Sequence, residues 1–196
     1  MEAKFFSQAL IKFLSSLIII ILLLFIPAGT LDYMNGWLFI GLLFIPMLIV
    51  GIVAFIKSPE LLKRRLNAKE EENEQKMIIL ISGIMFLFAF ITAGANFRFG
   101  WHELPKTAVM IASIIFLASY AMYAEVLREN EYLSRTVEVS ENQKVVDRGL
   151  YGIIRHPMYT STIFLFLSMP LVLNSIVSFI IMMIYPAIIV LRIRNE

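Results

Sequence analysis

Six apolar runs, separated by short polar segments, make up most of the chain. The first four cover about residues 13–27, 37–56, 77–95 and 108–124. A helix needs roughly 20 apolar residues to cross a hydrocarbon core about 30 Å thick, so these runs predict four transmembrane helices. The first run follows basic residues, as in a signal peptide. No small-residue cleavage site comes after it, however, and the chain continues into the second run, so we expect a retained helix.

The last two runs, about residues 158–173 and 176–191, are shorter and are separated only by Asn174 and Ser175. This spacing predicts a tight helical hairpin, tilted or only partly exposed to lipid. The fold class is therefore predicted to be all-α, a polytopic transmembrane helix bundle of five to six membrane segments. We expect a single integral membrane domain over 1–196. Residues 1–124 would form four transmembrane helices, and residues 125–196 a cytoplasmic-face cofactor region plus the hairpin.

Composition supports a membrane protein and argues against several other classes. Of the 196 residues, 59% are hydrophobic and 16% are charged, whereas about 25% are charged in typical soluble domains. The net charge of +2 is too small and too scattered to predict a nucleic-acid partner. The chain has no cysteine, which excludes disulfides, thiolate nucleophiles and cysteine zinc sites. Because His102 and His156 are the only histidines, we expect no metal centre.

The charges between the apolar runs predict the orientation of the helices. Residues 57–76 carry six basic and five acidic side chains, while residues 28–36 contain no Lys or Arg. Basic residues concentrate in short cytoplasmic loops, so 57–76 and both termini are predicted to be cytoplasmic, in a bacterial plasma membrane or the endoplasmic reticulum. We interpret 57–76 as a solvated loop with a short surface helix. Tyr33 and Trp37 are predicted to lie at the opposite membrane interface, together with an ordinary interfacial His102.

A long polar segment, residues 125–156, ends at a predicted helix start. Proline is tolerated in the first turn of a helix and pushes the residue before it out of the α region, so His156 and Pro157 mark this start. Upstream, residues 134–146 alternate in a strand-like way and are expected to cap a site. The hairpin then returns the chain to the same face. The candidate site therefore combines Tyr151, Arg155, His156, Pro157 and Tyr159 with Arg192, Arg194 and Glu196.

Taken singly, arginines at the ends of membrane helices often only extend toward water. Two polar clusters that meet across a hairpin favour a ligand site instead. The spacing alone does not name the reaction.

The same segment resembles the carboxy-terminal half of the isoprenylcysteine carboxyl methyltransferase family and its phospholipid N-methyltransferase relatives. The family pattern is Gly-Pro-Tyr, then Arg-His-Pro-x-Tyr, then Arg-Ile-x-x-Glu-Glu. The matching residues are Arg155, His156, Pro157, Tyr159, Arg192, Ile193 and Glu196. The resemblance covers about residues 125–196. Leu150 stands where the family has proline, Ser161 where it often has glycine, and the family pattern continues past the position of Glu196 with a second glutamate and an amphipathic segment.

The resemblance implies methyl transfer from S-adenosylmethionine to a lipophilic small-molecule or lipid-modified acceptor within the membrane lipid. It implies that the cofactor is bound by Tyr151, Arg155, His156, Pro157, Tyr159 and Glu196. Arg192, Arg194 and Glu196 would be the catalytic residues. An arginine would orient an acceptor carboxylate, which needs no general base, whereas an amine would need His156 or Glu196 to take a proton.

The favoured function is O-methylation of a carboxylate like that of an isoprenylcysteine. Three alternatives stay open: a phospholipid amine N-methyltransferase, an NADPH enzyme of the sterol-reductase type, and a non-catalytic membrane protein whose polar groups only anchor helix ends. The small size of the chain argues against the reductase. The sequence does not indicate the oligomeric state.

Overall fold

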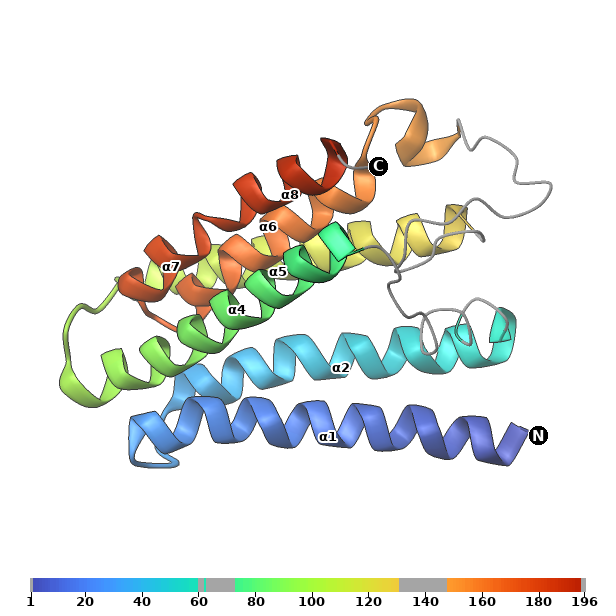
Figure 1. The fold of residues 1–196 in the computed structure, drawn as a ribbon. Coiled ribbons are helices and arrows are strands. Elements are labelled where there is room, and N and C mark those ends of the chain that lie inside the picture. Colours follow the sequence, from blue (N-terminus) through green and yellow to red (C-terminus); the bar gives the residue numbers. More distant parts are fainter. Residues whose placement is uncertain (1, 60–61, 63–72, 131–147, 195–196) are drawn as a thin grey trace.

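A computed structural model describes residues 2–59, 62, 73–130 and 148–194, and these residues form helices and short connections (Figure 1). The helices are α1 (Glu2–Ala28), α2 (Met34–Lys57), α4 (Asn73–Phe99), α5 (Lys106–Glu129), the 3₁₀ turn η1 (Gly149–Gly152), α6 (Pro157–Val172), α7 (Ile176–Met182) and α8 (Tyr185–Arg194). The described residues contain no strand. The predicted all-α bundle is confirmed.

Five segments of the described chain are long and apolar enough to cross a membrane. They are Phe5–Ala28, Met34–Lys57, Gln75–Phe99, Lys106–Glu129 and Ile176–Arg194, and Pro157–Val172 is a shorter apolar helix. The last long segment consists of α7 and α8, which follow one another through a turn at Met183 and Ile184. The protein is therefore a multi-pass membrane protein, with the five to six segments predicted. Its two described ends lie at the same end of the bundle (Figure 1).

The turn between α6 and α7 is the predicted hairpin turn. Asn174 has a φ of +58°, a left-handed conformation that asparagine tolerates better than most residues. Its Oδ1 atom accepts a hydrogen bond from the Leu104 backbone N–H at 2.6 Å. Ser175 begins α7, and its Oγ atom accepts from the Ser178 N–H at 3.2 Å. The two residues that interrupt the apolar pattern thus form the turn and the helix cap.

Tyr33, between α1 and α2, packs inside the protein, whereas Trp37, which was predicted to lie at the same interface, has an exposed side chain. The Tyr33 side chain is fully buried, whereas 42% of Trp37 is exposed. The Tyr33 hydroxyl donates to the Leu173 carbonyl oxygen at 2.5 Å, and its ring stacks on Phe97 with 4.5 Å between centroids. Burial raises the pKa of Tyr33 well above its usual range, so the phenol stays a neutral donor. Tyr33 therefore ties the hairpin turn to the α1–α2 connection.

Tyr33→Phe should destabilise the protein by about 1–3 kcal/mol, because it leaves the buried Leu173 carbonyl without this donor. Thermal unfolding of the purified protein would measure the loss. Trp37→Phe is the matched control: its indole donates to the Leu31 carbonyl in an exposed position, so a smaller effect is expected. Equal effects of the two substitutions would contradict the proposed role of Tyr33.

Candidate functional site

Three aromatic side chains fix the relative levels of α4, α6 and α8. The ring of Phe86 in α4 lies 4.7 Å from that of Phe166 in α6 and 6.0 Å from that of Tyr185 in α8, measured between centroids. Phe166 and Tyr185 are themselves 5.0 Å apart. These contacts define one cross-section of the bundle.

Both candidate clusters lie beyond this cross-section, at the end of the bundle that holds the described chain ends (Figure 1). His156 precedes Phe166 by ten residues, and Arg192 follows Tyr185 by seven. With a rise of about 1.5 Å per helical residue, His156 and Arg192 lie roughly 15 Å and 10 Å from the cross-section. The start of α6 and the end of α8 therefore lie at the same end of the bundle, within about one helical turn of each other in level.

The start of α6 presents one buried and one half-buried ring. Pro157 is the first residue of α6, and His156 precedes it in a non-helical conformation with a φ of −130° and a ψ of 68°. The His156 side chain is half-buried, makes no capping hydrogen bond and lies 6.1 Å from the buried Tyr159 ring. Arg155 is exposed. A helix start favours anions, and an imidazole beside it adds a hydrogen-bond donor.

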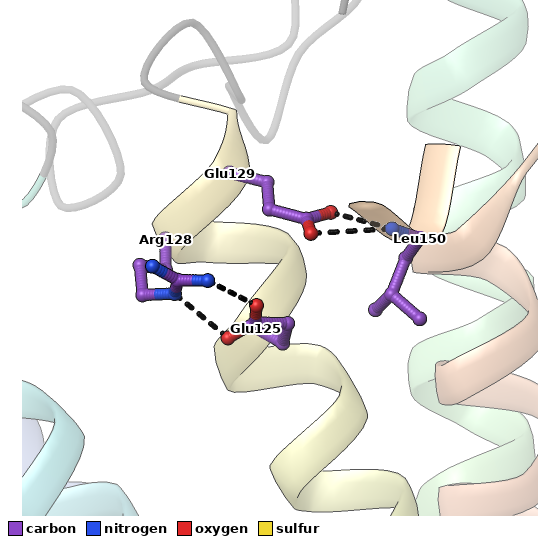
Figure 2. A network of polar contacts seen from close by, with 4 residues as sticks. All are labelled: Glu125, Arg128, Glu129 and Leu150. Carbon is purple, nitrogen blue, oxygen red and sulfur yellow. Dashed lines mark hydrogen bonds and ion pairs between the residues drawn. The ribbon is translucent and has the colours of Figure 1, made fainter. Parts of the chain in front are cut away.

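The turn that contains Tyr151 is hydrogen-bonded to the end of α5. Both carboxylate oxygens of Glu129 accept from the Leu150 backbone N–H, at 3.2 and 3.0 Å (Figure 2). The Tyr151 hydroxyl accepts from Asn130 Nδ2 at 3.0 Å. Gly149 has a φ of +56°, and a Cβ there would overlap the Glu129 carboxylate. The turn therefore requires glycine at this position, and Glu129 and Asn130 hold Tyr151 in place.

The end of α8 carries one half-buried arginine, Arg192, and one exposed arginine, Arg194. Arg192 lies two helical turns from Tyr185. Glu196 lies outside the described residues, as do 134–146 and most of 57–76.

Glu125 and Arg128 form a bidentate pair at 2.8 and 2.5 Å, but this pair lies exposed on α5 (Figure 2). Within the described ranges, no group of three or more His, Asp or Glu side chains could hold a metal ion.

Comparison with known families identifies this region. Residues 108–196 match the model of the isoprenylcysteine carboxyl methyltransferase (ICMT) family. This segment, a little under half of the chain, is therefore similar to the ICMT family. Comparison with curated proteins and with solved structures gave no match. The family and the long apolar helices support a membrane methyltransferase with a lipophilic or lipid-modified acceptor.

The segment that matches the ICMT model, residues 108–196 and below called the ICMT segment, begins earlier than the sequence motifs predicted. The motifs placed the resemblance at about 125–196, but the family match also includes nearly all of α5. The reason is structural: α5 packs along α6, and its last residue, Glu129, holds the turn of Tyr151. The predicted separation of the fourth apolar run from the family region is therefore wrong. Helices α1, α2 and α4 lie outside the ICMT match.

The sequence did not indicate that Glu129, Asn130 and Gly149 position Tyr151. An acidic residue in the last turn of a helix opposes the helix dipole, and this was the one indication in the sequence that Glu129 has a specific partner.

Glu129→Ala should lower the free energy of unfolding by about 1–2 kcal/mol and weaken ligand binding, because it frees the turn of Tyr151. Glu129→Gln keeps one acceptor oxygen and should retain most of both properties. Thermal unfolding and ligand titration would measure the two effects. Glu125→Ala is the control, since Glu125 pairs only on the surface. If Glu125→Ala and Glu129→Ala behaved alike, Glu129 would have no special role.

Proposed function

We propose that the protein transfers a methyl group from S-adenosylmethionine to the carboxylate of a lipophilic acceptor such as an isoprenylcysteine. One observation carries the proposal. Three features of the ICMT segment lie at one end of an apolar bundle. They are the start of α6, the turn of Tyr151 that is hydrogen-bonded to the end of α5, and the half-buried Arg192. A polar site at the end of lipid-exposed helices fits a water-soluble cofactor and a membrane-embedded acceptor.

The residues present fit the functional groups of this cofactor. His156 and the start of α6 would bind its carboxylate, because a donor and a helix amino terminus both favour an anion. The buried Tyr159 and the fixed Tyr151 offer aromatic surface for adenine. Pro157 sets the helix start, Arg155 would contact the cofactor from its exposed position, and Glu196 would accept from the ribose hydroxyls or the ammonium group.

When bound, S-adenosylmethionine supplies a methyl group on a cationic sulfur. A carboxylate oxygen of the acceptor would attack this methyl carbon, and the carbon–sulfur bond would break with its electron pair on sulfur. The products are a methyl ester and a neutral thioether, and no proton moves. The chain has only to orient the reactants and exclude water. The half-buried Arg192 would hold the acceptor carboxylate through a bidentate pair, with Arg194 and Glu196 at the rim.

The apolar surroundings provide a route for the acceptor. Large apolar side chains are exposed along the helices, among them Phe164 at 54% and Ile180 at 64%. A lipid tail lying against such a surface would reach the polar end laterally while its head group entered the site. We place this end, with both termini, on the cytoplasmic side, in a single domain in which 125–196 forms the cofactor region.

Two measurements on the detergent-purified protein test the proposal. S-adenosylhomocysteine at about 100 times its dissociation constant should add roughly 2.7 kcal/mol of stability, and NADPH should add none. Labelled methyl groups should pass to a prenylated cysteine but not to its carboxamide, and base should release them as methanol because they are esters. Stabilisation by NADPH alone would overturn the proposal in favour of a reductase. Base-stable methylation of a phospholipid amine would overturn the carboxylate assignment.

A further inference from the structure

Gln75, near the start of α4, is a buried polar side chain that the proposed function does not use. Its side chain has no exposed surface, and neither Oε1 nor Nε2 has a hydrogen-bond partner among the described residues. A buried amide without partners destabilises a protein and calls for a specific explanation. Asn96 of α4 donates to two carbonyl groups although its Oδ1 atom accepts no hydrogen bond among the described residues, and Ser119 of α5 donates within its own helix, so Gln75 is the buried amide of α4 with neither atom bonded.

The geometry of α4 directs Gln75 toward the candidate site. Gln75 precedes Phe86 by eleven residues. Eleven residues are just over three whole helical turns, so the two side chains leave α4 in directions about 20° apart. Phe86 contacts α6 and α8. Gln75 therefore lies on the face of α4 that looks toward these two helices.

The level of Gln75 along the bundle is also that of the site. Gln75 lies roughly 16 Å from the aromatic cross-section, toward the end that holds the described chain ends, and His156 lies roughly 15 Å from it on α6. The Gln75 amide, which has no partner among the described residues, is thus level with the α6 start and lies on the face of α4 that looks toward α6 and α8.

We propose that Gln75 is a further cofactor-binding residue whose carboxamide pairs with the adenine edge of S-adenosylmethionine. The inference rests on the proposed function. A carboxamide has one donor and one acceptor side by side, which match the ring nitrogen and exocyclic amine of adenine. It is less suited to the charged groups of the cofactor, which a helix start, an imidazole and carboxylates would bind. The ligand would satisfy both amide atoms, which have no partner among the described residues.

The test is a binding cycle on the full chain in detergent. The ligands are S-adenosylhomocysteine and its analogue with hydrogen in place of the adenine amine. The variant is Gln75→Met, which keeps the volume and removes the amide. For the wild-type chain, loss of the amine should weaken binding about 10-fold. Gln75→Met should bind S-adenosylhomocysteine about 10-fold more weakly than the wild type, yet lose little further affinity for the analogue.

Each other outcome has a distinct meaning. Wild-type affinity in Gln75→Met, or losses that simply multiply, would overturn the pairing with adenine while leaving the proposed function standing. Failure of the wild-type chain to bind S-adenosylhomocysteine would overturn the proposed function and this inference with it. The control is Ser82→Ala, on the same helix, where the Ser82 hydroxyl donates back to the Ile78 carbonyl and should not affect either ligand. A lower melting temperature of Gln75→Met without ligand would indicate a structural role and overturn the inference.

Discussion

His156→Ala should weaken binding of S-adenosylhomocysteine by about 10- to 100-fold without unfolding the protein. A hydrogen bond to a charged group contributes about 1.5–3 kcal/mol, and this substitution would remove the donor nearest the α6 start. The cost to folding should be small, because His156 is only half-buried and does not cap the helix. Titration calorimetry on the detergent-purified variant would measure the affinity.

The chain provides a matched control for this prediction in its other histidine. His102 lies on the connection between α4 and α5, with an exposed side chain, at the opposite end of the bundle. His102→Ala should therefore bind the ligand like the wild type. His156→Asn keeps a side-chain donor and should recover some of the affinity. Unchanged binding in His156→Ala would remove His156 from the cofactor site and leave it as a residue of the helix start alone.

The architecture could be predicted from the sequence because it depends on local patterns. Apolar length fixed the helices, and Asn174 with Ser175 marked the hairpin turn because their side chains favour a left-handed residue and a helix cap. Pro157 marked the α6 start in the same way. The convergence of the two polar clusters followed from the hairpin.

The hydrogen bonds that position the elements of the site could not be predicted from local patterns. Membrane helices that are apolar on all sides give little indication of which face points inward. The contacts of Tyr33 with Leu173 and of Glu129 with Leu150 join residues far apart in the sequence and depend on the final packing. Gln75 looked like the end of a charged loop, and only its position three turns below Phe86 places it toward the site.

Arg192→Ala should lower kcat for the carboxylate acceptor by about 100-fold and change the affinity for S-adenosylhomocysteine little. A bidentate guanidinium–carboxylate pair fixes the direction of the attacking oxygen, and a misplaced nucleophile loses about this much rate. Arg192→Lys keeps the charge but not the fork, so it should recover substrate binding more than kcat. Initial rates of ester formation, measured over a range of acceptor concentrations, would separate kcat from KM.

Arg128 supplies the control for Arg192. Arg128 is exposed and already paired with Glu125, so Arg128→Ala should leave both kcat and KM unchanged. If Arg192→Ala lost cofactor binding and kcat together, Arg192 would belong to the cofactor site. If it kept full activity, the carboxylate would be oriented by another group, and the half-buried Arg192 would serve only the packing at the end of α8.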